Sequence, residues 1–116
     1  MADKTYDLED RLIEFASSVI QFGKFVDNGY AGVHLNKQLT RSGTSPALNY
    51  GEAQASELRR DFIHKMKVCL KELRETKICL LIIKRSGLAK NQEPLGELLD
   101  ESSQLIAIFT ASILTA

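Results

Sequence analysis

The sequence has no tryptophan, two prolines and two histidines, and its fifteen Lys/Arg residues are balanced by fifteen Asp/Glu. Few prolines leave long helices uninterrupted. A net charge of zero argues against a protein whose main task is to bind phosphate backbones, because such proteins usually carry a basic excess. His34 and His64 have no metal-ligating side chain three or four positions later. We therefore expect no metal site.

Cysteine is also scarce, and long apolar runs are missing. Cys69 and Cys79 lie ten residues apart, about 15 Å along a helix, which is too far for a disulfide. The N-terminus resembles no secretory signal. The longest apolar run, residues 78–83, is far too short to cross a bilayer. These features predict a soluble, cytoplasmic protein with reduced thiols and no contact with a membrane.

Patterns typical of an active site are absent. No serine or cysteine sits on a recognisable strained turn. Residues 29–32 contain two glycines but lack both a preceding strand and the Lys-Ser/Thr pair of a phosphate-binding loop. We therefore predict no catalytic residues, no cofactor, no small-molecule substrate and no enzymatic activity.

Apolar residues recur in alternating steps of four and three in three segments, which predicts three helices that each bury one face. The first series is Leu8, Leu12, Phe15, Val19, Phe22 and Val26. The second is Phe62, Met66, Cys69, Leu73, Thr76, Leu80 and Ile83. The third is Leu95, Leu99, Ser102, Leu105 or Ile106, Phe109 and Ile113.

Turn and capping residues predict where these helices begin and end. Thr5 or Asp7 is expected to cap the first helix. Gly29 is expected to adopt a left-handed conformation that ends the first helix. Gly87 is expected to end the helix of the second apolar series in the same way. Leu88 would then make the hydrophobic contact of a Schellman motif.

A further helix is expected over residues 31–53, although its pattern is interrupted at residues 42–46. Pro46 removes one backbone hydrogen bond and crowds the carbonyl of Ser42. We predict one helix, kinked near Gly43 and Pro46, with two shorter helices as the alternative. Four helices with short connections predict an all-α, antiparallel up-down-up-down bundle, with residues 1–116 forming one domain.

Thr76 is a polar residue in an apolar series, and Glu72 lies one turn before it. Buried polar groups need hydrogen-bond partners. We therefore predict a polar layer in which Asn49 and Glu52 of the second helix pair with Glu72 and Thr76.

Charge is distributed unevenly between the helices. Residues 57–85 contain nine Lys/Arg against four Asp/Glu, whereas residues 86–116 contain one Lys against four Asp/Glu, and residues 1–28 also carry a net charge of −3. We favour complementary packing of a basic helix between two acidic ones. The alternative is a basic surface for RNA, for which the candidate contacts are Arg59, Arg60, Lys67, Lys71, Arg74 and Lys77.

Two segments, residues 78–83 and 105–109, are apolar around the whole helix. A helix in a monomeric bundle needs only an apolar stripe of about 100°. Ile78, Ile82, Ile106 and Ile108 exceed that requirement. They predict an interface with further copies of the same chain, and hence a homo-oligomer.

Three stretches of sequence carry a family resemblance. Residues 38–54 read QLTRSGTSPALNYGEAQ, residues 61–66 read DFIHKM and residues 70–76 read LKELRET. Together with residues 6–16, YDLEDRLIEFA, they resemble the bacterial 23S rRNA intervening-sequence proteins, also called the S23 ribosomal protein family. The resemblance extends over nearly the whole chain.

This resemblance implies an antiparallel bundle that assembles into a ring-shaped homopentamer, and it implies no enzyme activity. A related branch works with a reverse transcriptase and nucleic acid. The leading hypothesis is therefore a non-enzymatic, oligomeric scaffold or adaptor. The alternative is an accessory protein associated with RNA or with a nucleic-acid-binding protein, acting through the basic helix.

Overall fold

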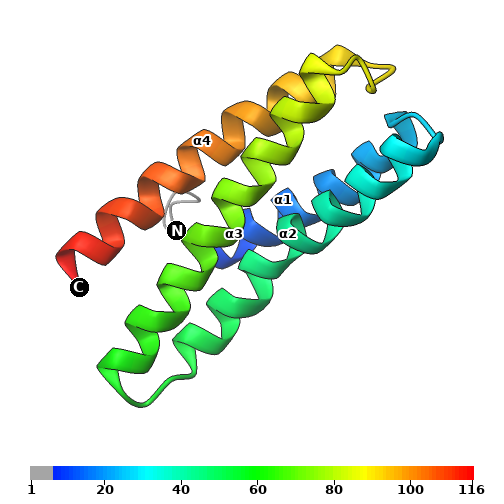
Figure 1. The fold of residues 1–116 in the computed structure, drawn as a ribbon. Helices are drawn as coiled ribbons and strands as arrows, with labels where there is room; N and C mark the ends of the chain where they lie inside the picture. The colour runs from blue at the N-terminus through cyan, green and yellow to red at the C-terminus, as the bar shows by residue number, and fades with distance from the viewer. Residues whose placement is uncertain (1–6) are drawn as a thin grey trace.

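The computed structural model describes residues 7–116, which form four α-helices and one short 3₁₀ turn. The helices are α1 (Leu8–Phe22), α2 (Tyr30–Gln54), α3 (Arg59–Arg85) and α4 (Gln92–Thr115), and η2 (Gly23–Phe25) follows α1 (Figure 1). Within these residues the chain forms no strand, only one isolated bridge between two loops. The predicted all-α class is confirmed.

The predicted apolar series of α1 lies inside the molecule. Four of its members are buried in the helix, and Val26 is buried just beyond it. Asp7 caps the helix by accepting a hydrogen bond from the backbone N–H of Asp10 at 3.0 Å, whereas Thr5 lies outside the described residues. The predicted left-handed Gly29 is wrong, because its φ is −72° and it precedes α2 as the N-cap residue.

A single helix of 25 residues runs through Pro46, so the alternative of two shorter helices is wrong. The kink expected near Pro46 stays a prediction. Gly43, three residues before the proline, allows α1 to approach α2 closely. A Cβ atom at that position would lie 2.9 Å from both γ-methyl groups of Val19.

The boundary between α3 and α4 follows the predicted pattern. Gly87 has a φ of +67°, and the backbone N–H of Leu88 donates to the carbonyl of Ile83 at 3.1 Å, as in a Schellman motif. Asn91 then caps α4. The predicted face of α4 is displaced at one point, because Leu98 is buried while Leu99 is only half-buried.

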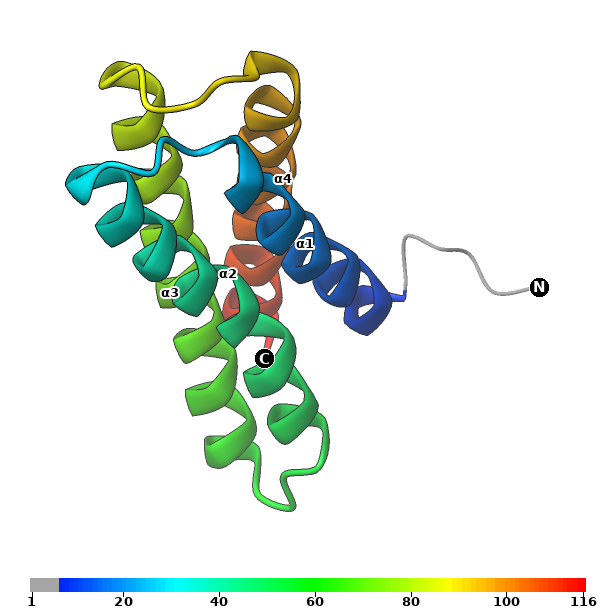
Figure 2. The ribbon, with the colours of Figure 1, turned by 90° about the vertical axis from the view of Figure 1, so that its right-hand side faces the viewer.

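Two loops at one end of the molecule are joined through their backbones. The N–H of Asp27 donates to the carbonyl of Leu88 at 2.8 Å, and the N–H of Lys90 donates to that of Phe25 at 2.7 Å. Figure 2 shows both loops at this end and the connection between α2 and α3 at the other, so consecutive helices run in opposite directions. It follows that α1 and α3 point the same way.

All four helices contribute to one core. Both α1 and α3 pack against α2 and α4, which places α1 and α3 diagonally opposite each other. Near the ends of α2 and α4, Tyr50 meets Phe109 edge to face at 5.9 Å between ring centroids.

Candidate interaction surfaces

A buried polar contact joins α2 to α3. The hydroxyl of Thr76 lies 2.9 Å from that of Ser42 and 2.8 Å from the carbonyl of Glu72, and both hydroxyl-bearing residues are fully buried. Glu72, also buried, accepts a hydrogen bond at 3.2 Å from Arg41, which contacts Glu75 as well. Thr76 and Glu72 thus lie in one polar layer, but their partners come from an earlier part of α2 than predicted.

The predicted partners Asn49 and Glu52 take no part in this layer. Asn49 donates to the hydroxyl and the carbonyl of Ser45 within its own helix. Glu52 pairs with Lys65 at 2.6 Å near the connection between the helices. This part of the prediction is wrong because α2 and α3 run in opposite directions, so Thr76 lies level with Ser42 rather than with a residue seven or ten positions later.

The four isoleucines predicted at an interface have two different environments. On α3, Ile78 is 58% exposed and Ile82 is 44% exposed. On α4, Ile106 and Ile108 are only partly buried, and Ile106 packs against the core. The exposed pair on α3 therefore remains the stronger interface candidate.

Two exposed isoleucines on α1 were not predicted. Ile13 is 49% exposed and Ile20 is 54% exposed, and Asp10 and Glu14 are exposed beside them. We call this group the acidic face: Asp10, Ile13, Glu14 and Ile20. The seven-residue spacing of the two isoleucines, off the buried series, was the signal in the sequence.

The outward side of α3 carries cations beside apolar groups. A surface depression there is lined by Lys67, Leu70, Lys71, Arg74, Glu75 and Ile78. We call five of these residues the basic face: Lys67, Leu70, Lys71, Arg74 and Ile78. Among the other predicted nucleic-acid contacts, Arg59 and Arg60 are exposed near the start of α3, and Lys77 is half-buried.

The expected packing of a basic helix between two acidic ones is wrong for the part of the chain that is described. Ion pairs of α3 with other helices reach only α2, through Arg41 and Glu52. Lys67, Lys71 and Arg74 have no carboxylate of residues 7–116 within 4.0 Å. Their charge is therefore available at the surface.

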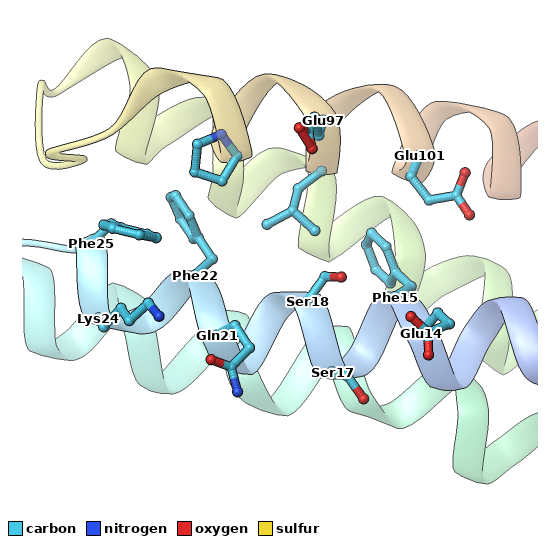
Figure 3. Close-up of a pocket in the computed structure, with 12 residues that line it drawn as sticks. Glu14, Phe15, Ser17, Ser18, Gln21, Phe22, Lys24, Phe25, Glu97 and Glu101 are labelled. Carbon is cyan, nitrogen blue, oxygen red and sulfur yellow. The ribbon is translucent and has the colours of Figure 1, made fainter.

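A groove of about 550 Å³ separates α1 from the first half of α4 (Figure 3). Phe15 and Phe22 are at its base, and Glu14, Glu97 and Glu101 are among the residues that line it. The groove is not visible in the sequence, because its width depends on how far apart α1 and α4 lie. Its carboxylates would favour a cationic group.

One ion pair crosses between these two helices. Arg11 donates to both carboxylate oxygens of Glu101, at 3.0 and 2.7 Å. The hydrogen bond with Glu101 raises the pKa of Arg11. This bidentate pair ties α1 to α4 at one end of the groove.

Both thiols are held inside the protein. The sulfur of Cys69 lies 3.5 Å from the carbonyl of Pro46, and that of Cys79 lies 3.3 Å from the carbonyl of Leu35. Burial raises the pKa of Cys69 to about 12 and also raises that of Cys79. A thiol that stays protonated is a poor nucleophile.

Groups that could bind a metal do not converge in the described part of the chain. Among residues 7–116, no three His, Cys, Asp or Glu side chains form a possible metal-binding group. His34 and His64 are both exposed, on α2 and α3 respectively. No helix within this range is long and apolar enough to span a membrane.

The fold and its surfaces define a small, four-helix, all-α protein with charged and apolar groups on two outward helix faces. The chain belongs to the 23S rRNA-intervening sequence protein family, which matches residues 4–111. It is also similar to a crystal structure of a protein of unknown function from the S23 ribosomal protein family of Bacteroides thetaiotaomicron VPI-5482. The two share 30% identity and a TM-score of 0.82, over 90% of this chain and 96% of the other. None of the curated proteins matches.

Proposed function

We propose that this chain is a non-enzymatic protein whose antiparallel four-helix bundle assembles with identical copies into a scaffold or adaptor. The observation that carries the proposal is the exposure of Ile78 and Ile82 on α3. Ile13 and Ile20 on α1 are exposed to a similar degree. Burying a large aliphatic side chain fully contributes roughly 1.5–3 kcal/mol, so covering four half-exposed isoleucines would stabilise an oligomer substantially.

The proposed assembly has five copies and acts in the cytoplasm. The number five is supported by the resemblance to the intervening-sequence proteins. The cytoplasmic location is supported by the two cysteines, which are free and buried on one helix. Reduced thiols of this kind are typical of proteins in a reducing compartment.

The mass of the purified chain in solution tests the proposal. We expect light scattering and native mass spectrometry at micromolar concentration to give a multiple of 12.9 kDa. Ile78→Glu with Ile82→Glu should lower that mass while far-UV circular dichroism still shows helix. Leu114→Glu, which changes a residue 82% exposed near the C-terminus, is the matched control and should leave the mass unchanged. A wild-type monomer would refute the proposed assembly.

A second candidate function is association with RNA, which the cations of the basic face favour. Lys67, Lys71 and Arg74 recur in steps of four and three and are exposed, so they could contact successive phosphates. Retention on RNA should then fall steeply with salt concentration, because counterion release drives such binding. It should also be lost in Lys71→Glu with Arg74→Glu. Salt-independent or absent retention would leave the scaffold as the only candidate.

A further inference from the structure

The acidic face and the basic face lie on opposite sides of the molecule. Each belongs to a helix that packs against both α2 and α4, so the outward sides of α1 and α3 point away from each other. One face carries carboxylates with Ile13 and Ile20, and the other carries cations with Leu70 and Ile78. The two faces are therefore complementary in charge and alike in apolar content, but they cannot meet within one chain.

The two faces are also in register along the bundle. Val19 of α1 packs against Gly43, and Thr76 of α3 bonds to the adjacent Ser42, so Val19 and Thr76 lie at nearly the same level. Because α1 and α3 point the same way and both rise about 1.5 Å per residue, residues 57 positions apart share a level.

The difference of 57 positions places carboxylates of the acidic face at the same level as cations of the basic face. It places Asp10 level with Lys67, and Glu14 level with Lys71. It also places Ile13 level with Leu70, and Ile20 within one residue of the level of Ile78. Rotation about an axis parallel to the bundle changes no level. A neighbouring copy generated by such a rotation would therefore set Asp10 opposite Lys67 and Glu14 opposite Lys71.

We propose that the basic face of one copy docks against the acidic face of the next, so that the contact is heterologous and repeats around a ring. This inference rests on the proposed function and specifies its interface. A head-to-tail contact closes into a ring when the rotation closes and forms a fibre when it does not. The equal levels of the paired residues favour rotation without translation, and hence a ring. Two of the three cations on the basic face of each chain then lie opposite carboxylates of the next chain.

Charge reversal on one face and then on both tests this interface. Lys67→Glu with Lys71→Glu places carboxylates opposite Asp10 and Glu14, and Asp10→Lys with Glu14→Lys places cations opposite cations. Like charges facing each other across an interface cost several kcal/mol, so each double variant should raise the concentration of half-dissociation roughly a hundredfold or more. The quadruple variant exchanges the two charge sets and should restore the mass of the wild type.

Native mass spectrometry and light scattering supply the readout, with circular dichroism showing that every variant folds. Lys84→Glu with Lys90→Glu makes the same change of charge outside both faces and should leave the mass unchanged. An oligomer whose mass survives both reversals, or is not restored in the quadruple variant, would overturn this interface and leave the assembly itself standing. A wild-type chain that is monomeric would overturn both.

Discussion

At the scale of single residues, the contact between Ser42 and Thr76 is the most specific polar feature of the core. Both hydroxyls are fully buried, and they lie 2.9 Å apart. Within residues 7–116, the one other hydrogen bond of the Ser42 hydroxyl is long, 3.5 Å to the carbonyl of Leu39. Thr76 therefore supplies the better of the two partners available to the Ser42 hydroxyl.

Replacing Thr76 with valine should destabilise the protein by about 1–2 kcal/mol. The substitution keeps the shape of the side chain but removes its hydroxyl, which leaves Ser42 poorly satisfied in a buried site. Urea unfolding measures the loss. Thr110→Val is the matched control, since among the described residues the hydroxyl of Thr110 bonds only to the carbonyl of Ile106 in its own helix. The interpretation fails if both variants lose the same stability.

The sequence could identify Thr76 and Glu72 as buried but could not identify Ser42. A polar residue in an apolar series is visible from its spacing alone. Ser42 lies in a run of polar and small residues before Pro46. A hydroxyl in this run could equally form a hydrogen bond with a backbone group that the proline leaves without its usual partner. Only the register between α2 and α3 decides which hydroxyl meets Thr76.

At the scale of helices, two helical glycines, one buried and one exposed, should respond oppositely to substitution by alanine. Gly43→Ala puts a methyl group 2.9 Å from Val19, and overpacking of this kind costs about 1–3 kcal/mol. At Gly96, no atom of residues 7–116 beyond its chain neighbours and the adjoining backbone of α4 lies within 4 Å of where a Cβ would be, so Gly96→Ala should stabilise α4 by about 0.5–1 kcal/mol. Thermal and urea unfolding compare the two variants.

Val19→Ala in the Gly43→Ala background supplies the control for this prediction. If the clash is the cause, removing the methyl groups of Val19 should cost less in that background than in the wild type. Equal costs would show that α1 and α2 do not approach each other closely at this point.

Helix types and most boundaries followed from the sequence because they depend on local chemistry. Gly87 adopts the left-handed conformation expected of a glycine just after a helix, and Asp7 caps α1 as expected. Gly29 does not, because α1 passes into the 3₁₀ turn η2 before the chain turns. Phe25 and Asp27 at this turn bond to the neighbouring loop through their backbones, and spacing along the chain does not reveal such contacts.

At the scale of the whole molecule, assembly predicts a melting temperature that depends on protein concentration. An equilibrium that couples folding to association favours the native state as concentration rises. We expect the melting temperature of the wild type to increase between about 1 and 100 µM, and that of the Ile78→Glu, Ile82→Glu variant to stay constant. Differential scanning fluorimetry or calorimetry provides the measurement. Parallel behaviour of the two proteins would contradict the role assigned to these isoleucines.

The sequence revealed that positive and negative residues are concentrated in different helices. It did not reveal whether these side chains face solvent or a neighbouring helix. Net charge per segment is a count, whereas the partner of Lys71 depends on which side of α3 faces solvent. The same limit applies to the groove between α1 and α4, where Glu14 lies more than eighty positions from Glu97 and Glu101 in the sequence. The charged surface of α3 and the groove both depend on how each helix is rotated about its axis and how far apart the helices lie. The apolar periodicity shows which side of a helix is buried, but it does not determine the arrangement of the exposed sides.

The backbone bonds between the two loops bear on how freely this sequence can change. Asp27 and Lys90 both donate through the main chain, so the bonds that join the loops do not depend on their side chains. Any residue that keeps a backbone N–H can make these bonds, and proline is the one residue without it. The carboxylate of Asp27 also accepts a hydrogen bond from the backbone N–H of Gly29 at 2.9 Å, so residue 27 is constrained by its side chain as well. Residue 90 can therefore diverge during evolution, exchanging charge, size or polarity, while the two helical hairpins stay joined at this end.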